Sequence, residues 1–132
     1  MIEVWTDGAY SIPKQRGGYA FLIRDEDGDE IRRCVQIRYS SSQRAELVAI
    51  REAIRIIPGH EVVLIHTDSQ YAVGGFSGKW KLKANTDVWG TLMELAKGRD
   101  ITLKHIPRNT TPEHKVVDAA AKQAMYVGGG NF

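Results

Sequence analysis

The sequence contains almost no cysteine and no long hydrophobic run. Its single cysteine, Cys34, has no partner within the chain for a disulfide, so nothing indicates an oxidising compartment and we expect a cytoplasmic protein. The first residues, MIEVWTDG, lack the basic region and apolar stretch of a signal peptide. Apolar runs such as VVLI are far too short to cross a bilayer. We therefore expect neither a disulfide-stapled secreted module nor a membrane-spanning protein.

Neither sign of charge dominates the chain. Eighteen Lys and Arg against sixteen Asp and Glu give a formal net charge of +2, which favours anionic partners only weakly. The bases gather in the segments 13–16 and 79–83 and at Arg32, Arg33 and Arg38. The second segment, KWKLK, places a tryptophan and a leucine between lysines, which is typical of nucleic-acid surfaces. A solvated loop anchored by one tryptophan gives the same pattern, so the pattern leaves both interpretations open.

The length of 132 residues fits one domain with a real core. We expect a single domain over residues 1–126 and a short tail over 127–132, where the glycines of GGGNF indicate fraying and coverage of a sheet edge is the alternative. Three β-rich segments at 2–6, 17–25 and 30–39 are separated by short turns. This succession predicts an antiparallel meander.

The second half of the chain alternates helices and strands. Residues 40–57 have helical periodicity, with serines available as N-cap and Pro58-Gly59 to end the helix. The segment 61–67 is apolar on both faces, which predicts a central strand reached by a right-handed parallel crossover. The pattern then predicts a short helix near 69–75, a helix over 86–97, a strand over 101–106 and a last helix from Pro112. We expect an α/β fold with a five-stranded mixed sheet flanked by helices.

Four acids occupy positions where a site can form. Asp7 ends the first predicted strand and Asp68 ends the central one, so the two carboxylates lie side by side if these strands are parallel neighbours. Glu46 borders the buried face of the helix over 40–57, and Asp118 lies in the last helix beside a face of alanines.

Clustered acids repel one another and raise one another's pKa unless cations hold them. Magnesium is the natural cation, because it takes oxygen ligands from a few carboxylates and from substrate phosphates. Each acid also has an ordinary interpretation: Asp7 as a turn residue, Asp68 as an N-cap, Glu46 as a favourable charge in a first helical turn and Asp118 as a surface acid. The set of four is more specific than any member.

The motifs TDGAY, GGYAF, SSSQRAEL, HTDSQY and PEHKVVDAAAKQA, in this order and across nearly the whole chain, closely resemble ribonuclease H of type 1, in a compact form without the basic protrusion. The resemblance implies a ribonuclease H-like fold and a metal site formed by Asp7, Glu46, Asp68 and Asp118. It implies two Mg²⁺ ions, with Mn²⁺ as a substitute, and cleavage of the RNA strand of RNA/DNA hybrids to leave 3′-hydroxyl and 5′-phosphate ends.

The resemblance also implies substrate contacts. Ser42, Gln43 and Gln70 match positions that approach the RNA minor groove, where the 2′-hydroxyl distinguishes RNA from DNA. Ser41 and Asn85 match positions that hold a phosphate of the DNA strand. The aromatic that lines the DNA channel corresponds to Trp80. The small polar residues among these are equally suited to be caps or turn formers.

Three features depart from the family. Only the short segment 74–85 remains where many members carry a long basic helix and loop, and Pro13 stands where an Asn often contacts substrate. The mobile histidine loop before the last helix appears as IPRNTTPE, without a histidine, which leaves Arg108 or Asn109 at its place. Arg108 is then a candidate for phosphate contact. His114, four residues before Asp118, is a candidate to assist proton transfer, and a solvated histidine near a helix start is the alternative.

The leading functional prediction is therefore a monomeric, metal-dependent endonuclease that acts on RNA/DNA hybrids. The alternative is a hybrid-binding module of the same fold that has lost turnover, which the missing loop histidine and the short basic segment favour. Retention of all four acids opposes this alternative, because a binding module gains nothing from carboxylates that face phosphates. A recombinase of the same fold needs additional DNA-binding domains, which we do not expect here.

Overall fold

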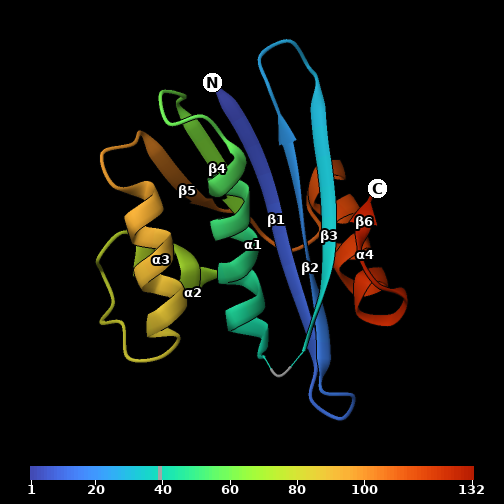
Figure 1. Ribbon diagram of the computed structural model, residues 1–132. Coiled ribbons are helices and arrows are strands. Elements are labelled where there is room, and N and C mark those ends of the chain that lie inside the picture. The colour runs from blue at the N-terminus through green and yellow to red at the C-terminus, as the bar shows by residue number, and fades with distance from the viewer. Residues whose placement is uncertain (39) are drawn as a thin grey trace.

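The computed structural model describes residues 1–38 and 40–132, in which one six-stranded sheet is covered on both faces by helices (Figure 1). The strands are β1 (Ile2–Ser11), β2 (Arg16–Arg24), β3 (Glu30–Arg38), β4 (Val63–Thr67), β5 (Ile101–His105) and β6 (Gly130–Asn131). The helices are α1 (Ser42–Ile56), α2 (Gln70–Phe76), α3 (Thr86–Ala96) and α4 (Pro112–Val127). None of these described helices combines the length and the apolar character that a membrane span requires.

The sheet has the order β5-β4-β1-β2-β3-β6. β1, β2 and β3 pair antiparallel, whereas β4 pairs parallel with both β1 and β5. These pairings confirm the predicted α/β class and the meander joined to parallel strands. Tyr39, the expected last residue of the third strand, lies outside the described residues.

The first strand is longer than the sequence pattern predicts. β1 runs to Ser11 because β2 continues to pair with it, up to the pair Ser11–Arg16. Its parallel pairing with β4 stops earlier, at Trp5 and His66. The prediction that Asp7 ends the first strand is therefore wrong. Asp7 lies inside β1, just beyond the last residue of β1 that pairs with β4.

The sheet also has six strands instead of the expected five. Gly130 and Asn131 form the short β6, which pairs antiparallel with Cys34 and Arg33 of β3. A Cβ on Gly129 would lie 2.3 Å from the Cys34 carbonyl oxygen, so only glycine allows the chain to approach this edge so closely. Part of the GGGNF segment thus covers a sheet edge.

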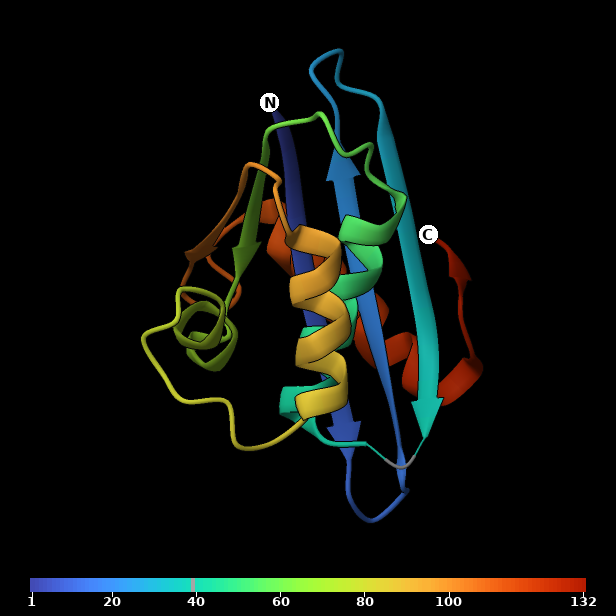
Figure 2. The same cartoon turned by 60° about the vertical axis from the view of Figure 1, so that its left-hand side comes forward.

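Helices lie on both sides of the sheet (Figure 2), and an apolar core joins the sheet to the helices on each side. The larger core joins the sheet to α1, α2 and α3 through side chains such as Leu47, Ile50 and Trp89. The smaller core joins it to α4, where the alanines at 120, 121 and 124 permit close packing against Trp5 and Leu22. Because both faces are covered, β4 is buried at four of its five residues.

Helix α1 contacts β1 backbone to backbone at Gly8. A Cβ on Gly8 would lie 2.6 Å from the Ala45 carbonyl carbon and 2.6 Å from the Glu46 nitrogen. The absence of a side chain at Gly8 therefore sets how near α1 lies to β1. Because Gly8 directly follows Asp7, this contact also brings Glu46 close to Asp7.

We predict that Gly8→Ala destabilises the protein by about 1–3 kcal/mol, because neither the helix nor the strand backbone can shift without disturbing the core. Equilibrium unfolding in urea measures the change. Gly90→Ala is the matched control: Gly90 lies in α3, and the space that an added methyl group would occupy there is open. Gly90→Ala should raise the free energy of unfolding by about 0.5–1 kcal/mol, because alanine has the higher helix propensity. Equal stability of Gly8→Ala and the wild type would show that the contact is not tight.

Candidate active site

The structure brings the four predicted acids together from four parts of the fold. Asp7 comes from the middle of β1, Glu46 from the second turn of α1, Asp68 from the residue after β4 and Asp118 from the middle of α4. Asp7 and Asp118 are only 3% and 7% exposed. Asp7, Glu46 and Asp68 line a cleft of about 420 Å³.

The carboxyl groups share protons when no cation is bound. Burial is the main cause that raises the pKa of Asp7 to about 7, and a hydrogen bond to Asp118 and the charges of Asp68 and Asp118 add to it. Burial also raises the pKa of Glu46 well above its usual value, followed by the charge of Asp7. Protonated Glu46 then donates to Asp7, and protonated Asp7 donates to Asp118.

Asp118 is the acid that keeps its negative charge. Burial raises its pKa, but hydrogen bonds from Asp7, Lys122 and Arg108 outweigh burial and leave the pKa lowered. The Arg108 guanidinium lies 3.2 Å from Asp118 Oδ1, and Lys122 Nζ lies 3.1 Å from Oδ2. The cluster therefore holds protons at Asp7 and Glu46, whereas cations among the described residues neutralise Asp118.

The donor set fits a divalent cation. Glu46 Oε2 is buried and has no hydrogen-bond partner among the described residues, so it is an acceptor without a donor in this environment. A carboxylate oxygen of Asp7 and one of Asp68 lie within 4.8 Å of each other. Carboxylate oxygens at such spacing are the ligands that Mg²⁺ prefers.

His114 is fully buried, so it is not the solvated histidine of the alternative interpretation. Its Nδ1 accepts a hydrogen bond from the Asn109 backbone N–H at 3.1 Å, which assigns the ring proton of the neutral form to Nε2. Nε2 lies 3.7 Å from Asp68 Oδ2. Burial lowers the pKa of His114, so the ring is neutral at pH 7. A protonated Nε2 cannot ligate a metal and instead faces Asp68.

A family model described as RNase H matches residues 1–126. The chain belongs to the RNase H family. This confirms the family predicted from the TDG, RAEL, TDSQ and DAAAKQ motifs. Members of the family are nucleases, which agrees with an acidic site that faces a cleft.

Several relatives have similar lengths. Ribonuclease HI of Helicobacter pylori (strain ATCC 700392 / 26695) is 28% identical over 130 residues, covering 92% of this chain and 90% of the relative. Ribonuclease H of Bordetella pertussis is 27% identical over 143 residues, covering 98% and 92%. The crystal structure of LC11-RNase H1 in complex with RNA/DNA hybrid matches with a TM-score of 0.75 at 21% identity, over 94% of this chain and 99% of that chain. This last likeness establishes the RNase H fold.

In this RNase H family member, a second cleft of about 480 Å³ adjoins the acids. Ser42, Gln43 and Gln70 line it together with Glu46, Asp68 and Arg108. The side chains that the sequence assigned to the RNA minor groove therefore lie beside the acids, on the first turns of α1 and α2.

Ser41 and Asn85 lie away from this second cleft, at the starts of α1 and α3. Ser41 is the N-cap of α1, and its hydroxyl accepts a hydrogen bond from the Arg44 N–H at 3.1 Å. Asn85 precedes α3 in the left-handed conformation, with φ of 55°, and its side chain does not cap the helix. Arg44 bonds both Asp87 oxygens, at 2.8 and 2.6 Å, and thereby joins the two helix N-termini.

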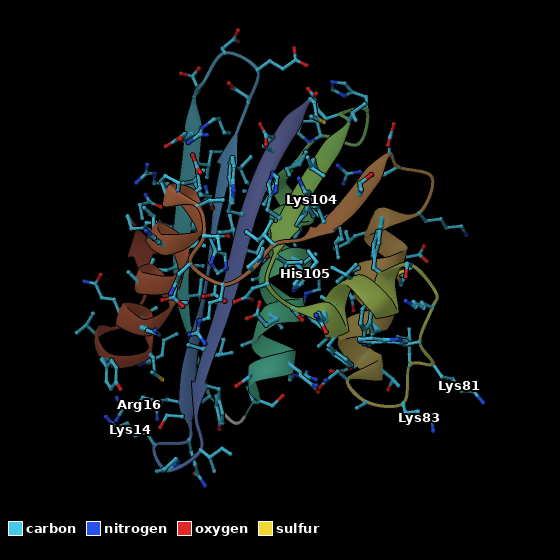
Figure 3. All side chains as sticks on the ribbon, turned by 180° about the vertical axis from the view of Figure 1, so that it is seen from behind. Lys14, Arg16, Lys81, Lys83, Lys104 and His105 are labelled. Atoms are coloured by element: carbon cyan, nitrogen blue, oxygen red, sulfur yellow. The ribbon has the colours of Figure 1, made fainter. Side chains whose placement is uncertain are left out.

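Trp80 combines both interpretations of the KWKLK segment. A Cβ on Gly74 would lie 2.5 Å from the indole, so the ring packs directly on α2. The ring is nevertheless 43% exposed. Lys81 and Lys83 project from the same loop, at the side of the molecule opposite Lys14 and Arg16 (Figure 3).

Sequence reasoning missed two residues that support the site. Lys122 pairs with Asp118 across one helical turn, and the i,i+4 spacing was a readable signal. Tyr71 is the second: its hydroxyl accepts from Trp89 Nε1 at 3.1 Å and from Asn85 Nδ2 at 3.4 Å. No sequence pattern indicates these contacts of Tyr71, because they join two separate helices and a loop.

We predict that the metal-free protein loses stability as the pH rises. The folded pKa of Asp7, about 7, lies above its ordinary value of 3.8, so the folded state retains a proton that the unfolded state releases. The resulting stabilisation is complete below about pH 4 and is lost through about pH 7, by up to roughly 4 kcal/mol. Glu46 acts in the same direction.

Urea unfolding in EDTA from pH 4 to pH 8 measures this slope. Asp7→Asn should flatten it and should be more stable than the wild type at pH 8, because the amide stays neutral. Asp100→Asn, at an exposed position before β5, is the control and should keep the wild-type slope. A slope unchanged in Asp7→Asn would mean that Asp7 is ionised throughout.

Proposed function

We propose that this protein is a metal-dependent endonuclease that hydrolyses the RNA strand of RNA/DNA hybrids and leaves 3′-hydroxyl and 5′-phosphate ends. The observation that carries the proposal is the convergence of Asp7, Glu46, Asp68 and Asp118 in one partly buried cluster. Burying mutually repelling acids destabilises a fold, so the arrangement is explained by cations that bind there. Membership of the RNase H family supports the substrate class.

The four acids would hold the cations, with Mg²⁺ as the physiological choice and Mn²⁺ as a substitute. The chemistry that two such ions would supply is activation of a water for attack on the phosphorus and stabilisation of the leaving oxygen. The acids must lose their shared protons for this binding, so metal affinity rises with pH.

Cationic side chains of the chain itself complete the site. Arg108, 60% exposed at its side chain, reaches Asp118 and lines the second cleft, so its remaining donors face the position of a phosphate beside the acids. Lys122 holds the other Asp118 oxygen and lines the first cleft. We propose that Arg108 contacts substrate phosphate at the place of the family's loop histidine.

Recognition of the hybrid would involve both strands. We propose that Ser42, Gln43 and Gln70 contact the RNA minor groove, since they line the cleft that contains Glu46 and Asp68. For the DNA strand, the joined N-termini of α1 and α3 at Ser41 and Asn85 suit a phosphate, because unpaired backbone N–H groups and helix dipoles favour anions. The exposed face of Trp80 with its neighbouring lysines would line the DNA channel.

The experiment that tests the function is cleavage of an end-labelled RNA/DNA hybrid beside duplex DNA and duplex RNA, with Mg²⁺, with Mn²⁺ and with EDTA. We expect cutting of the RNA strand of the hybrid with either metal and none in EDTA. Asp7→Asn should lower kcat by at least about 100-fold, because it removes a charged ligand from the cluster.

Asp100→Asn serves again as the control, since it changes the same chemical group far from the cleft. Tight hybrid binding without cutting under either metal would contradict the nuclease. It would instead support the hybrid-binding module, which the absence of a histidine from the loop over 106–113 favours.

We further propose that His114 is a positioning residue and not a proton donor or acceptor in the reaction. Its Nδ1 holds the Asn109 N–H, which fixes the loop that presents Arg108, and its Nε2–H faces Asp68. The ring has no exposed surface and lines neither of the two clefts beside the acids. One side chain thus links the loop to an acid of the cluster.

We predict that His114→Ala lowers kcat about 10–100-fold and raises the Mg²⁺ concentration needed for half-maximal rate, as loss of an outer-sphere contact does. The shape of the pH–rate profile from pH 6 to pH 9 should stay that of the wild type. His114→Gln places an amide near Asp68, and His114→Asn places an acceptor near the Asn109 N–H, so each should restore part of the loss. Disappearance of one limb of the pH profile in His114→Ala would contradict positioning and indicate acid–base chemistry.

A further inference from the structure

Lys14 and Arg16 lie at the side of the molecule opposite Lys81 and Lys83 of the KWKLK loop (Figure 3). They form a group with Arg38, which pairs with Arg16 across β2 and β3, and with two residues of α4. We call it the hairpin patch: Lys14, Arg16, Arg38, Lys122 and Tyr126. Lys14 belongs to the turn between β1 and β2, and Arg16 begins β2. Lys122, which also pairs with Asp118, and Tyr126 line the cleft of the acids, whereas Lys14, Arg16 and Arg38 do not.

Strand register places the patch on the same face of the sheet as Asp7. Asp7 pairs with Ala20, and four residues further along β1 Ser11 pairs with Arg16. Side chains alternate along strands, so residues an even number apart share a face. Arg38 lies opposite Arg16 on β3 and therefore also faces the α4 side.

The cations of the patch repel one another. Among the described residues, no carboxylate lies within ion-pair distance of Lys14, Arg16 or Arg38. Like charges directly opposite each other in adjacent strands are destabilising. Lys14 Nζ lies 4.2 Å from the centre of the Tyr126 ring, which holds the ammonium above an aromatic that is itself 54% exposed. An anion would relieve the repulsion.

The cleft of the acids leads to this patch. The residues that line it run from Asp7 through Ala9 and Tyr10 to Lys122 and Tyr126. At about 3.3 Å per residue, the four residues from Asp7 to Ser11 span about 13 Å, which a nucleic-acid strand covers in a few nucleotides. One continuous surface therefore joins the acids to the cations.

We propose that the hairpin patch binds the sugar-phosphate backbone of the substrate a few nucleotides from the cleavage position, with Tyr126 available to stack. This rests on the proposed function and adds a contact region on the opposite side from Trp80 and its lysines. The duplex is then held on both sides of the acids. Contact at the hairpin patch would compensate for the affinity lost through the shortness of the basic segment over 74–85.

The test measures KM, kcat and the salt dependence of KM for Lys14→Gln, Arg16→Gln and the double variant. The substrate is a long duplex with ribonucleotides confined to one short block, so that cleavage has a defined position. We expect a KM raised about 5–20-fold in the double variant with kcat unchanged. The slope of log KM against log salt should fall by about 1 for each lost phosphate contact.

Substrates trimmed to a few base pairs on one side or the other of the block locate the contact. The deficit of the double variant should disappear when one particular side is trimmed and persist when the other is. Lys97→Gln, which removes an exposed cation at the end of α3, is the matched control and should behave as the wild type.

If the wild type is active and the double variant has the same KM and the same salt slope, the inference is overturned. The proposed nuclease function is then unaffected. A lowered melting temperature with an unchanged salt slope would also overturn it, because the cations would then serve only the C-terminal end of α4. A wild type that cuts no hybrid would refute the proposed function itself. In that case, hybrid binding by the same variants in EDTA still tests the patch.

Discussion

The site depends on the contact between the backbone of α1 and Gly8 of β1. Because Gly8 has no side chain, the helix lies directly on the strand, and Glu46 reaches Asp7 from one face of the sheet while α4 brings Asp118 from the other. A helix held one methyl group further out would separate Glu46 from Asp7. The cluster of acids is thus a consequence of helix–strand packing, and the packing is set by one residue.

The electrostatics of the cluster are uneven for a structural reason. Asp118 is buried on α4, but two cations whose own side chains are largely exposed, Arg108 and Lys122, contact its carboxylate. Asp7 and Glu46 meet at the contact between β1 and α1, where no cationic side chain of the described residues contacts them, and burial instead favours their protonated forms. The two apolar cores on either side of the sheet offset the destabilisation caused by burying these acids. A polar cluster of this kind persists only between well-packed layers.

Much of the fold was readable from the sequence because it rests on local patterns. The helical periodicity over 40–57 and the doubly apolar segment over 61–67 predicted α1 and β4 to within two residues. The four acids were found from their places on the predicted elements together with the resemblance of their motifs to a known family. The length of β1, the pairing of β6 and the burial of His114 were not readable. Each depends on a partner distant in the chain: β2 extends β1, Cys34 and Arg33 receive β6, and Asn109 and Asp68 enclose His114.

The short β6 has a consequence for how molecules of this protein meet one another. β3 pairs with β2 along its whole length, but on its other side β6 pairs with only two of its nine residues, so most of that side has no neighbouring strand among the described residues. Such an edge is a template for addition of a strand from another chain and hence for aggregation. Arg32, Arg33 and Arg38 along β3 oppose this, because a second copy that added there would bring the same charges against them. The arginines of β3 therefore help to keep the protein dispersed at high concentration.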